Sequence, residues 1–415
     1  MEVRPGYKQT EVGVIPEDWE PVPMSSLGTF AKGQGIRKDE ATSGDISCVR
    51  YGEIYTHHND IVRFFNSRIS AEVARTSKRL KKGDLLFAVS GETKGEIGKC
   101  VSFVGGEEAY AGGDIVILSP NQGDSRFFGY LFNAPIIARQ KASRGQGDAV
   151  VHISAAGLAS IMLPLPPTKA EQEAIAEALS DADALIESLE KLIAKKRQIK
   201  QGAMQELLTG KKRLQGFSGE WEVKRLNVIA EIFSGGTPST NQPEFWDGDI
   251  LWCTPTDITA LNGGKYLSQT ARTITAEGLK ASAAGLIPAY SVVMTSRATI
   301  GECAINTVPV STNQGFKNFV PFQDIDGEFL YYLLQTKKQE FIGLCSGSTF
   351  LEIGKTQLAA FEIELPKEKS EQTAIATILS DMDTELAALE TKLAKARQLE
   401  QGMMQELLTG RIRLV

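Results

Sequence analysis

The chain has 415 residues, of which 42% are hydrophobic and 23% charged, and its formal net charge at pH 7 is −6. These values are typical of a folded protein with two or three domains. The longest apolar runs are the size of strands and stay below the roughly 18 residues of a membrane-spanning helix. The first residues also lack the apolar core of a signal peptide, so we expect a cytoplasmic protein.

Cysteine and histidine are scarce, which limits the chemistry that the side chains can support. The five cysteines form an odd set without a CxxC pair, which disfavours both a disulfide framework and a zinc site. We expect them to be buried as small hydrophobic residues. His57 and His58 are adjacent, and a solvated loop explains them better than a metal site does. The cysteines are Cys48, Cys100, Cys253, Cys303 and Cys345.

Residues 1–167 are predicted to form a first globular domain. Short runs of β-branched residues between Gly, Asn and Asp indicate a twisted, largely antiparallel sheet, with a shorter helix over residues 125–141. This part of the chain has no excess of basic side chains, which disfavours a free-standing nucleic-acid-binding protein. A local basic cluster fits either phosphate contacts or a solvated helical face. It consists of Arg75, Lys78, Arg79, Lys81 and Lys82.

Two long helices are predicted, over residues 168–210 and 368–415. The segment Glu171–Leu214 recurs as Glu371–Leu414 with more than half of its residues identical. Thr168 with Glu171 forms a capping-box pattern at the first helix, and Ser370 is a candidate cap for the second. Both copies end in a Thr-Gly pair that suits the end of a helix.

The apolar residues of both copies follow steps of four and three, which is typical of a coiled coil. A helix packed only on its own domain is the alternative, and the length and repetition disfavour it. Acidic residues lie early and basic residues late in each helix, so only an antiparallel pair opposes unlike charges. The predicted interface contains Ile175, Leu179, Ile186, Leu189, Ile193, Leu207, Ile375, Leu379, Leu386, Leu389, Leu393 and Leu407.

Residues 211–367 are predicted to form a second globular domain that is a diverged copy of the first. Ile46–Ile54 aligns with Leu251–Ile258, which pairs Cys48 with Cys253. A shorter helix is expected over residues 327–344. The fold class is therefore α+β, with two tandem pseudosymmetric α/β domains joined by two long antiparallel coiled-coil helices. The two helices are more alike in sequence than the two domains are. The chain therefore combines two similar helical spacers with two dissimilar globular domains.

No residues form a convincing catalytic motif. Asp84 with Glu92 and Lys94 resembles a nuclease arrangement, but the second domain has Ser296 to Thr299 in its place. We therefore expect a non-catalytic chain without a metal site of its own. Such a chain would act by recognition.

The order domain, helix, domain, helix resembles the specificity subunit of type I restriction-modification enzymes along essentially the whole chain. The supporting motifs are Tyr7–Trp19 and Gly216–Trp221 before the domains, Leu163–Ile175 and Leu365–Ile375 at the helix starts, and Gln-Glu-Leu-Leu-Thr-Gly at both helix ends.

This resemblance implies two target-recognition domains, each of which reads one half of a split, asymmetric sequence in double-stranded DNA. It implies a helical spacer that fixes the gap between the halves. The implied partners are two methyltransferase subunits, which modify adenine with S-adenosylmethionine, and two motor-nuclease restriction subunits, which use ATP and magnesium. No cofactor is expected in this chain.

Sequence readout needs hydrogen-bonding side chains on loops at the edge of a sheet. For each candidate, a solvated loop residue is the alternative. In the first domain the candidates are Lys32, Gln34, Arg37, Lys38, Tyr51, Ser90, Lys94, Arg144 and Gln146. In the second they are Ser234, Thr237, Thr254, Thr256, Ser296, Arg297, Thr299, Asn313, Gln314 and Ser348.

Two other functions stay open at this point. One is a stand-alone or decoy sequence-specific DNA-binding protein without methylase partners, which specific binding by the purified chain alone would favour. The other is a pseudosymmetric scaffold that binds only proteins, for which the assembled complex would not protect DNA.

Overall fold

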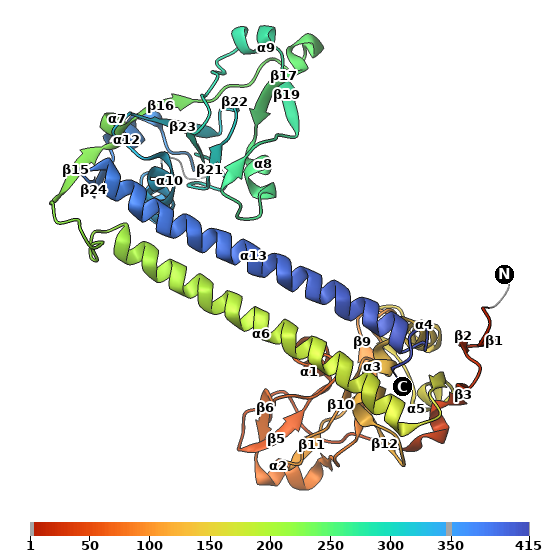
Figure 1. Cartoon of the computed structure of the whole chain (residues 1–415). Helices are drawn as coiled ribbons and strands as arrows, with labels where there is room; N and C mark the ends of the chain where they lie inside the picture. The colour runs from red at the N-terminus through yellow and green to blue at the C-terminus, as the bar shows by residue number, and fades with distance from the viewer. Residues whose placement is uncertain (1–3, 346–350, 415) are drawn as a thin grey trace. The chain divides into compact units, whose positions relative to one another are not determined.

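The computed structural model describes residues 4–345 and 351–414. Its contacts divide the chain into two compact units. The first unit contains the chain up to Glu190 and the segment from Thr391 onward, and the second is Lys191–Glu390. Each unit therefore combines one globular part with portions of both long helices, α6 (Lys169–Leu207) and α13 (Lys369–Leu407) (Figure 1).

The globular part of the first unit contains two four-stranded sheets, in the orders β10-β8-β12-β4 and β6-β5-β11-β7. Three strand pairs, β1–β2, β3–β14 and β9–β13, complete it. The strands are β1 (Tyr7–Thr10), β2 (Gly13–Pro16), β3 (Glu20–Pro23), β4 (Gly28–Lys32), β5 (Ile46–Val49), β6 (Ser67–Ile69), β7 (Lys78–Arg79), β8 (Leu85–Ala88), β9 (Ser90–Gly91), β10 (Cys100–Ser102), β11 (Ala109–Ala111), β12 (Ile115–Pro120), β13 (Val151–His152) and β14 (Met162–Leu165). The helices are α1 (Tyr51–Thr56), α2 (Ala71–Thr76), α3 (Ser125–Asn133), α4 (Pro135–Arg144) and α5 (Ala155–Ala159).

The second unit repeats this plan with a five-stranded sheet, β16-β23-β20-β21-β18, a three-stranded sheet, β19-β17-β22, and the pair β15–β24. Its strands are β15 (Trp221–Arg225), β16 (Ala230–Ser234), β17 (Trp246–Cys253), β18 (Tyr266–Leu267), β19 (Arg272–Ile274), β20 (Val292–Thr295), β21 (Cys303–Asn306), β22 (Val310–Thr312), β23 (Phe316–Pro321) and β24 (Glu362–Pro366). Its helices are α7 (Leu226–Ile229), α8 (Pro255–Ala260), α9 (Ala276–Lys280), α10 (Gly327–Thr336), α11 (Lys338–Gly343) and α12 (Lys355–Ala360).

Most strand pairs are antiparallel, as the sequence predicts; β5–β11, β17–β22 and β18–β21 are parallel. The main core of the first unit buries aromatic residues of α3 together with Ile175 and Leu179 of α6 and Leu407 of α13. Burying one such aliphatic side chain contributes about 1.5–3 kcal/mol. The helix ends are thus part of the globular core, and the same holds for Leu207 and Ile375 in the second unit.

The helix predicted over residues 125–141 is two helices, α3 and α4. Ala134 is extended (φ −58°, ψ 145°) because it precedes Pro135, whose ring disfavours a helical neighbour. In the second unit the helix predicted over residues 327–344 is likewise divided, at Lys337, into α10 and α11.

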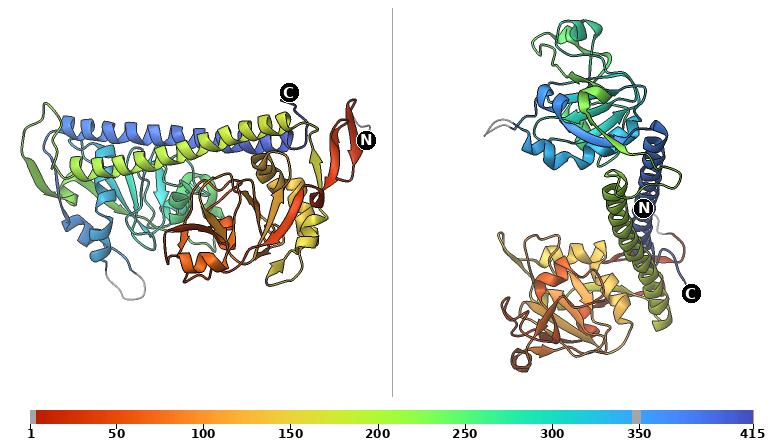
Figure 2. Two further views of the ribbon diagram at one scale, coloured as in Figure 1. Left: turned by 90° about the horizontal axis from the view of Figure 1, so that it is seen from below. Right: turned by 90° about the vertical axis from the view of Figure 1, so that its left-hand side faces the viewer.

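Within each unit, α6 and α13 lie side by side and run in opposite directions (Figures 1 and 2). In the first unit Arg397 pairs with Glu190 at 2.6 Å. In the second unit Arg197 pairs with Glu390 at 2.6 Å, and Lys200 pairs with Asp383. The late basic residues of each helix therefore face the earlier acidic residues of the other, which confirms the antiparallel prediction.

The helix caps differ in part from the sequence prediction. The Thr168 hydroxyl accepts the Glu171 amide at 3.2 Å, as expected of a cap. The Glu171 carboxylate does not return to the cap, because it is buried against the guanidinium of Arg413. Ser370 lies inside the first turn of α13, which begins at Lys369, so it is not the cap.

A further expectation is wrong. His58 is not a solvated loop residue: only 3% of it is exposed, its ring centroid lies 5.6 Å from that of Phe64, and burial lowers its pKa.

Four of the five cysteines are buried, as predicted, and Cys345 is half-buried. The basic cluster of residues 75–82 does not form one helical face, because Lys78 and Arg79 lie in strand β7.

Candidate nucleic-acid interface

In the first unit, four loops are joined by main-chain hydrogen bonds at the ends of the sheets. The Gln34 amide donates to Ala111, and the Gly113 amide donates to Gly35, at 3.2 and 3.0 Å. The Gly112 amide donates to Val49 at 3.0 Å, and the Val89 amide donates to Asp114 at 3.1 Å. The loops around residues 34, 50, 90 and 112 therefore form one continuous polar rim.

The second unit builds the same rim. The Gly236 amide donates to Thr312 at 2.9 Å, the Asn313 amide to Cys253 at 3.0 Å, and the Ser296 amide to Gly315 at 2.7 Å. Gly235 and Gly236 are required here, because a Cβ at either would collide with the backbone of a neighbouring loop.

The shared hydrogen bonds correct the sequence alignment of the two domains by one residue. Val49 lies opposite Ala111 in the pair β5–β11, and Cys253 lies opposite Thr312 in the pair β17–β22. Cys253 therefore corresponds to Val49, not to Cys48. The aligned segments differ in length by one residue, so the alignment needs a gap. Matching the two cysteines places this gap after them, whereas the strand pairing places it before them.

In the first unit the structure brings Ser90 and Gln146 together around His152. The Ser90 hydroxyl lies 2.9 Å from His152 Nδ1, and Gln146 exchanges two main-chain hydrogen bonds with His152. His152 was not among the sequence candidates. Only the pairing of β9 with β13 places it there, because 62 residues separate it from Ser90.

The other first-unit candidates lie around this rim and differ in whether their side chains are already hydrogen-bonded within the protein. Lys32 ends β4, Tyr51 begins α1, and both are exposed, as are Gln34, Arg37, Lys38 and Lys94. Arg144 ends α4, and its guanidinium donates to the Ser160 hydroxyl at 2.8 Å and to the Gln140 carbonyl at 2.9 Å. Its donors are thus partly occupied.

In the second unit the Thr237 hydroxyl bonds to the Gln314 side chain, so two candidates from distant segments meet. The hydroxyl and the amide of Thr254 both donate to the Asp257 carboxylate in the first turn of α8, at 2.7 Å, and the Asn313 side chain accepts the Gly315 amide. The remaining polar candidates are spread over the rim: Ser234 ends β16, Thr256 is exposed on α8, and Thr299 follows the loop after β20 with its hydroxyl buried and unpaired.

Ser296 and Arg297 belong to an ionic cluster on the same rim. Arg297 pairs with Glu352 at 2.8 Å, and the Lys317 ammonium lies 3.6 Å from the same carboxylate and 3.3 Å from the Ser296 hydroxyl. Burial opposes ionisation of Glu352, but its two basic neighbours prevail and lower its pKa. Ser348 lies outside the described residues.

Arg272, at the start of the edge strand β19, is a candidate that the sequence analysis omits. Its guanidinium carbon lies 3.6 Å from the ring centroid of Trp246 and 5.6 Å from that of Trp252. Both tryptophans are almost fully buried, and Arg272 itself is exposed. The sequence gives no sign that Arg272 contacts these tryptophans, because the contact depends on the pairing of β17 with β19.

The first unit also has a cavity of about 1280 Å³, lined by α1, the loop after β9 and both long helices. Burial raises the pKa of Asp60 to about 7, and the carboxylates of Asp183 and Glu400 add to this. Burial likewise lowers the pKa of Lys141 to about 8. Lys141 donates to the Gly98 carbonyl at 2.7 Å.

The nuclease-like carboxylates do not meet in this cavity. Glu92 lines it, but Asp84 does not. Asp84 is buried, and its side chain accepts from the Lys81 amide at 2.8 Å and the Ser119 hydroxyl at 2.6 Å. It therefore secures a turn.

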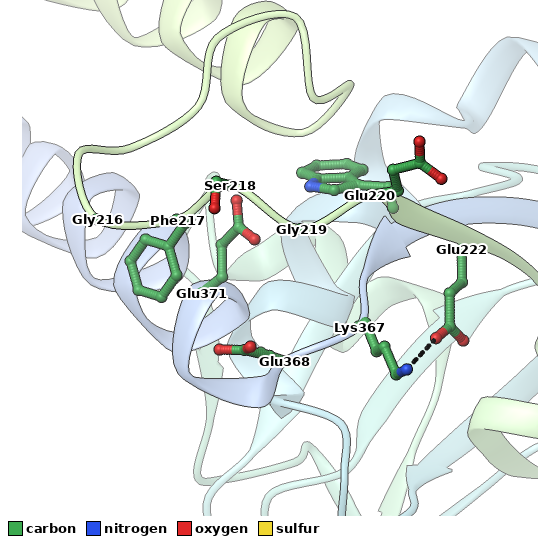
Figure 3. Close-up of a pocket in the computed structure, with 10 residues that line it drawn as sticks. Gly216, Phe217, Ser218, Gly219, Glu220, Glu222, Lys367, Glu368 and Glu371 are labelled. Atoms are coloured by element: carbon green, nitrogen blue, oxygen red, sulfur yellow. Dashed lines mark ion pairs between the residues drawn. The ribbon is translucent and has the colours of Figure 1, made fainter.

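A smaller cavity of about 530 Å³ in the second unit lies beside the start of α13 (Figure 3). Lys367 and Glu222 form an ion pair across 3.9 Å at its edge. Glu371 is buried and accepts two hydrogen bonds from Arg213, at 2.7 and 2.8 Å. In the first unit Arg413 binds Glu171 in the same way and also binds Asp18. Each unit thus fixes the start of one long helix with an arginine that follows the other.

Among the described residues, no three His, Cys, Asp or Glu side chains gather as a metal site requires. In the same part of the chain, no helix is both long enough and apolar enough to cross a membrane.

Comparison with known proteins follows the same duplication. The chain matches the Type I restriction modification DNA specificity domain twice, over residues 16–201 and 218–400. The type I restriction enzyme MjaIX specificity subunit of Methanocaldococcus jannaschii is 41% identical over 166 residues, 40% of this chain and 38% of that protein. The EcoR124I/EcoR124II specificity subunit of Escherichia coli is 30% identical over 190 residues, 44% of this chain and 46% of that protein. The chain thus matches less than half the length of these two relatives.

A longer match is the MjaVIII specificity subunit of M. jannaschii, 25% identical over 428 residues, which cover 96% of this chain and 94% of that protein. Among solved structures, the S subunit of a type I restriction-modification system from M. genitalium has a TM-score of 0.61 at 15% identity and covers 98% of both chains. A chain from a study of complex assembly in the type I R-M system has a TM-score of 0.55 at 17% identity, over 96% of this chain and 99% of that one. These two structures share the fold. Because the family match spans most of the chain and occurs twice, the chain belongs to the type I restriction-modification DNA specificity family.

Proposed function

We propose that the chain reads a split, asymmetric DNA sequence, one half with the rim of each unit. The observation that carries the proposal is that the two rims have the same main-chain scaffold but different side chains. The same main-chain hydrogen bonds hold the loops in both units, but the bridged pair Ser90 and His152 in one rim corresponds to Arg297 and Glu352 in the other. Different donors and acceptors on equivalent scaffolds suit two different half-sites.

The chain is non-catalytic, since its relatives are named specificity subunits. We therefore propose that it brings other subunits to the DNA. In this proposal the two pseudoequivalent units would present equivalent docking surfaces to two methyltransferase and two restriction subunits. S-adenosylmethionine, ATP and magnesium would then bind to those partners.

Partner subunits would also explain how an acidic chain can act on DNA. The net charge is −6 and neither globular part has a basic excess, so few phosphates could be neutralised by this chain alone. A methyltransferase that closes around the DNA would supply the missing phosphate contacts. The side chains of the two rims would then supply the sequence information.

The proposal is tested by producing the chain with its methyltransferase subunit in cells that lack other adenine methylation. Single-molecule sequencing of the genome should find methylated adenines in one bipartite motif, with two different halves and a fixed gap. A continuous or palindromic motif, or no motif, contradicts the proposal. Specific binding by the purified chain with no methylation in the co-producing cells would instead favour a stand-alone or decoy DNA-binding protein.

A further inference from the structure

Arg272 is stacked on a tryptophan at the start of the edge strand β19 in the second unit. Its guanidinium lies over the face of Trp246 at 3.6 Å, and Trp246 meets Trp252 edge-on, with ring centroids 5.0 Å apart. Such stacking fixes the plane of the guanidinium and leaves its N–H donors at the edge free to bond. The side chain is therefore positioned before any ligand arrives.

The donors of Arg272 are also unused within the described part of the chain. No carboxylate among those residues forms an ion pair with it, whereas Arg297, Arg225 and Arg213 each have one. Nor does its guanidinium donate to any described carbonyl or hydroxyl. An exposed, oriented arginine with free donors is suited to a planar acceptor pair on a ligand.

The two tryptophans join Arg272 to the rim. Trp252 Nε1 donates to the Gly236 carbonyl, and Trp246 Nε1 donates to the Ser239 carbonyl, both at 3.0 Å. The loop that they hold continues through Thr237 to Gln314. Arg272 thus lies beside the loops that are proposed to meet DNA.

The first unit has no equivalent arginine. Arg272 lies opposite Trp252 in the pair β17–β19, and Ser67 lies opposite Cys48 at the corresponding place in the pair β5–β6. Ser67 is buried, and its hydroxyl donates to Glu53. Arg272 is therefore one of the features that make the two reading domains unequal.

We propose that Arg272 reads a guanine in the half-site of the second unit, through the O6 and N7 acceptors in the major groove. This inference rests on the proposed function. Arginine is the side chain whose two parallel donors match that pair of acceptors, and such a contact discriminates strongly against the other bases. A contact to phosphate would use the same charge but would carry no sequence information.

The test is adenine-methylation sequencing of cells that contain the methyltransferase subunit and the wild-type, Arg272→Gln or Arg272→Lys chain. The wild-type motif should contain a G·C pair that Arg272→Gln relaxes by about 5- to 150-fold, at one position of one half only. Arg272→Lys keeps a cation over Trp246 but lacks the fork, so it should relax the same position. The control, Arg225→Gln, removes an exposed arginine of the same unit that pairs with Glu362 at 3.5 Å, and should leave the motif unchanged.

Several results would overturn the inference. These are an unchanged motif in either folded variant, or uniformly weaker methylation at all sites with unchanged base preference, which would indicate a phosphate contact. Thermal unfolding of each purified variant separates these results from misfolding, and loss of folding in both variants would assign Arg272 a structural role instead. If the wild-type chain itself gives no bipartite motif, the proposed function fails, independently of Arg272.

Discussion

The substitution Asp60→Asn should stabilise the first unit at neutral and alkaline pH. Asp60 is 9% exposed, its carboxylate accepts the Asn133 amide at 2.8 Å, and the like charges of Asp183 and Glu400 act on it. Burial, chiefly, raises its pKa from 3.8 to about 7. Asparagine keeps an oxygen for Asn133 and removes the charge that the site disfavours.

The expected magnitude follows from the raised pKa. At 1.36 kcal/mol for each tenfold change in acidity, an increase from 3.8 to about 7 corresponds to about 4 kcal/mol. The folded state binds the proton more tightly than the unfolded state does. The destabilisation by Asp60 is therefore complete above about pH 7, declines as the pH falls, and is absent below the unfolded pKa of 3.8.

The measurement is the midpoint of thermal unfolding at pH 8, 6 and 4, with hydrogen exchange of β10 and α3 to report on the first unit alone. Each kcal/mol should raise the midpoint by about 2–4 °C in a unit of this size. Asp39→Asn, at an exposed aspartate of the same unit, is the control for the lost charge. A gain that is equal at pH 8 and pH 4, or a loss at pH 8, would refute the reasoning.

Four other substitutions or rearrangements test other parts of the structure. Glu400→Lys should stabilise the first unit, because burial and the like charge of Asp183 raise the pKa of Glu400, which shows that a negative charge is disfavoured there. The equivalent residue of the other helix, Lys200, pairs with Asp383 in the second unit; a lower unfolding midpoint would contradict this prediction. Arg413→Ala should lower the free energy of unfolding by about 1–3 kcal/mol, since it leaves the buried Glu171 carboxylate without its donor, and unchanged exchange at the start of α6 would argue against it. Inserting one heptad at matched places in both long helices adds about 10.5 Å, so methylation sequencing should show a gap longer by about three base pairs with both half-sites intact. A half-chain of residues 1–212 should pair with a second copy and direct methylation to an inverted repeat of one half-site; a monomer in the presence of the methyltransferase would count against the two-fold arrangement.

The antiparallel helix pair was predictable because its signal is local. Acidic residues lie early and basic residues late within one segment, and Coulomb attraction between facing helices needs no knowledge of the globular parts. Thr168 was predictable as a cap for the same reason, since the cap involves residues three apart. The carboxylate of Glu171 was not, because its partner Arg413 lies 242 residues away.

The rim was only partly predictable. Turn residues such as Thr237 and Gln314 can be recognised as loop residues, but the hydrogen bond between them depends on the register of several strands. His152 and Arg272 were missed because strand pairing alone brings them to the rim. The burial of His58 was missed because a polar pair of residues gives no local sign of the apolar surroundings that cover one of them.

The division of the units has a consequence for how the protein is made. The first unit needs the segment from Thr391 onward, whose Leu407 and Leu408 are buried in the same core as Ile175 and Leu179. On the ribosome that segment emerges about 200 residues after Glu190, which at 5–20 residues per second is a delay of about 10–40 s. The domain that is synthesised first is therefore completed last. A premature stop late in translation would leave the opening domain, with its apolar helix face uncovered, as the part exposed to proteases and chaperones.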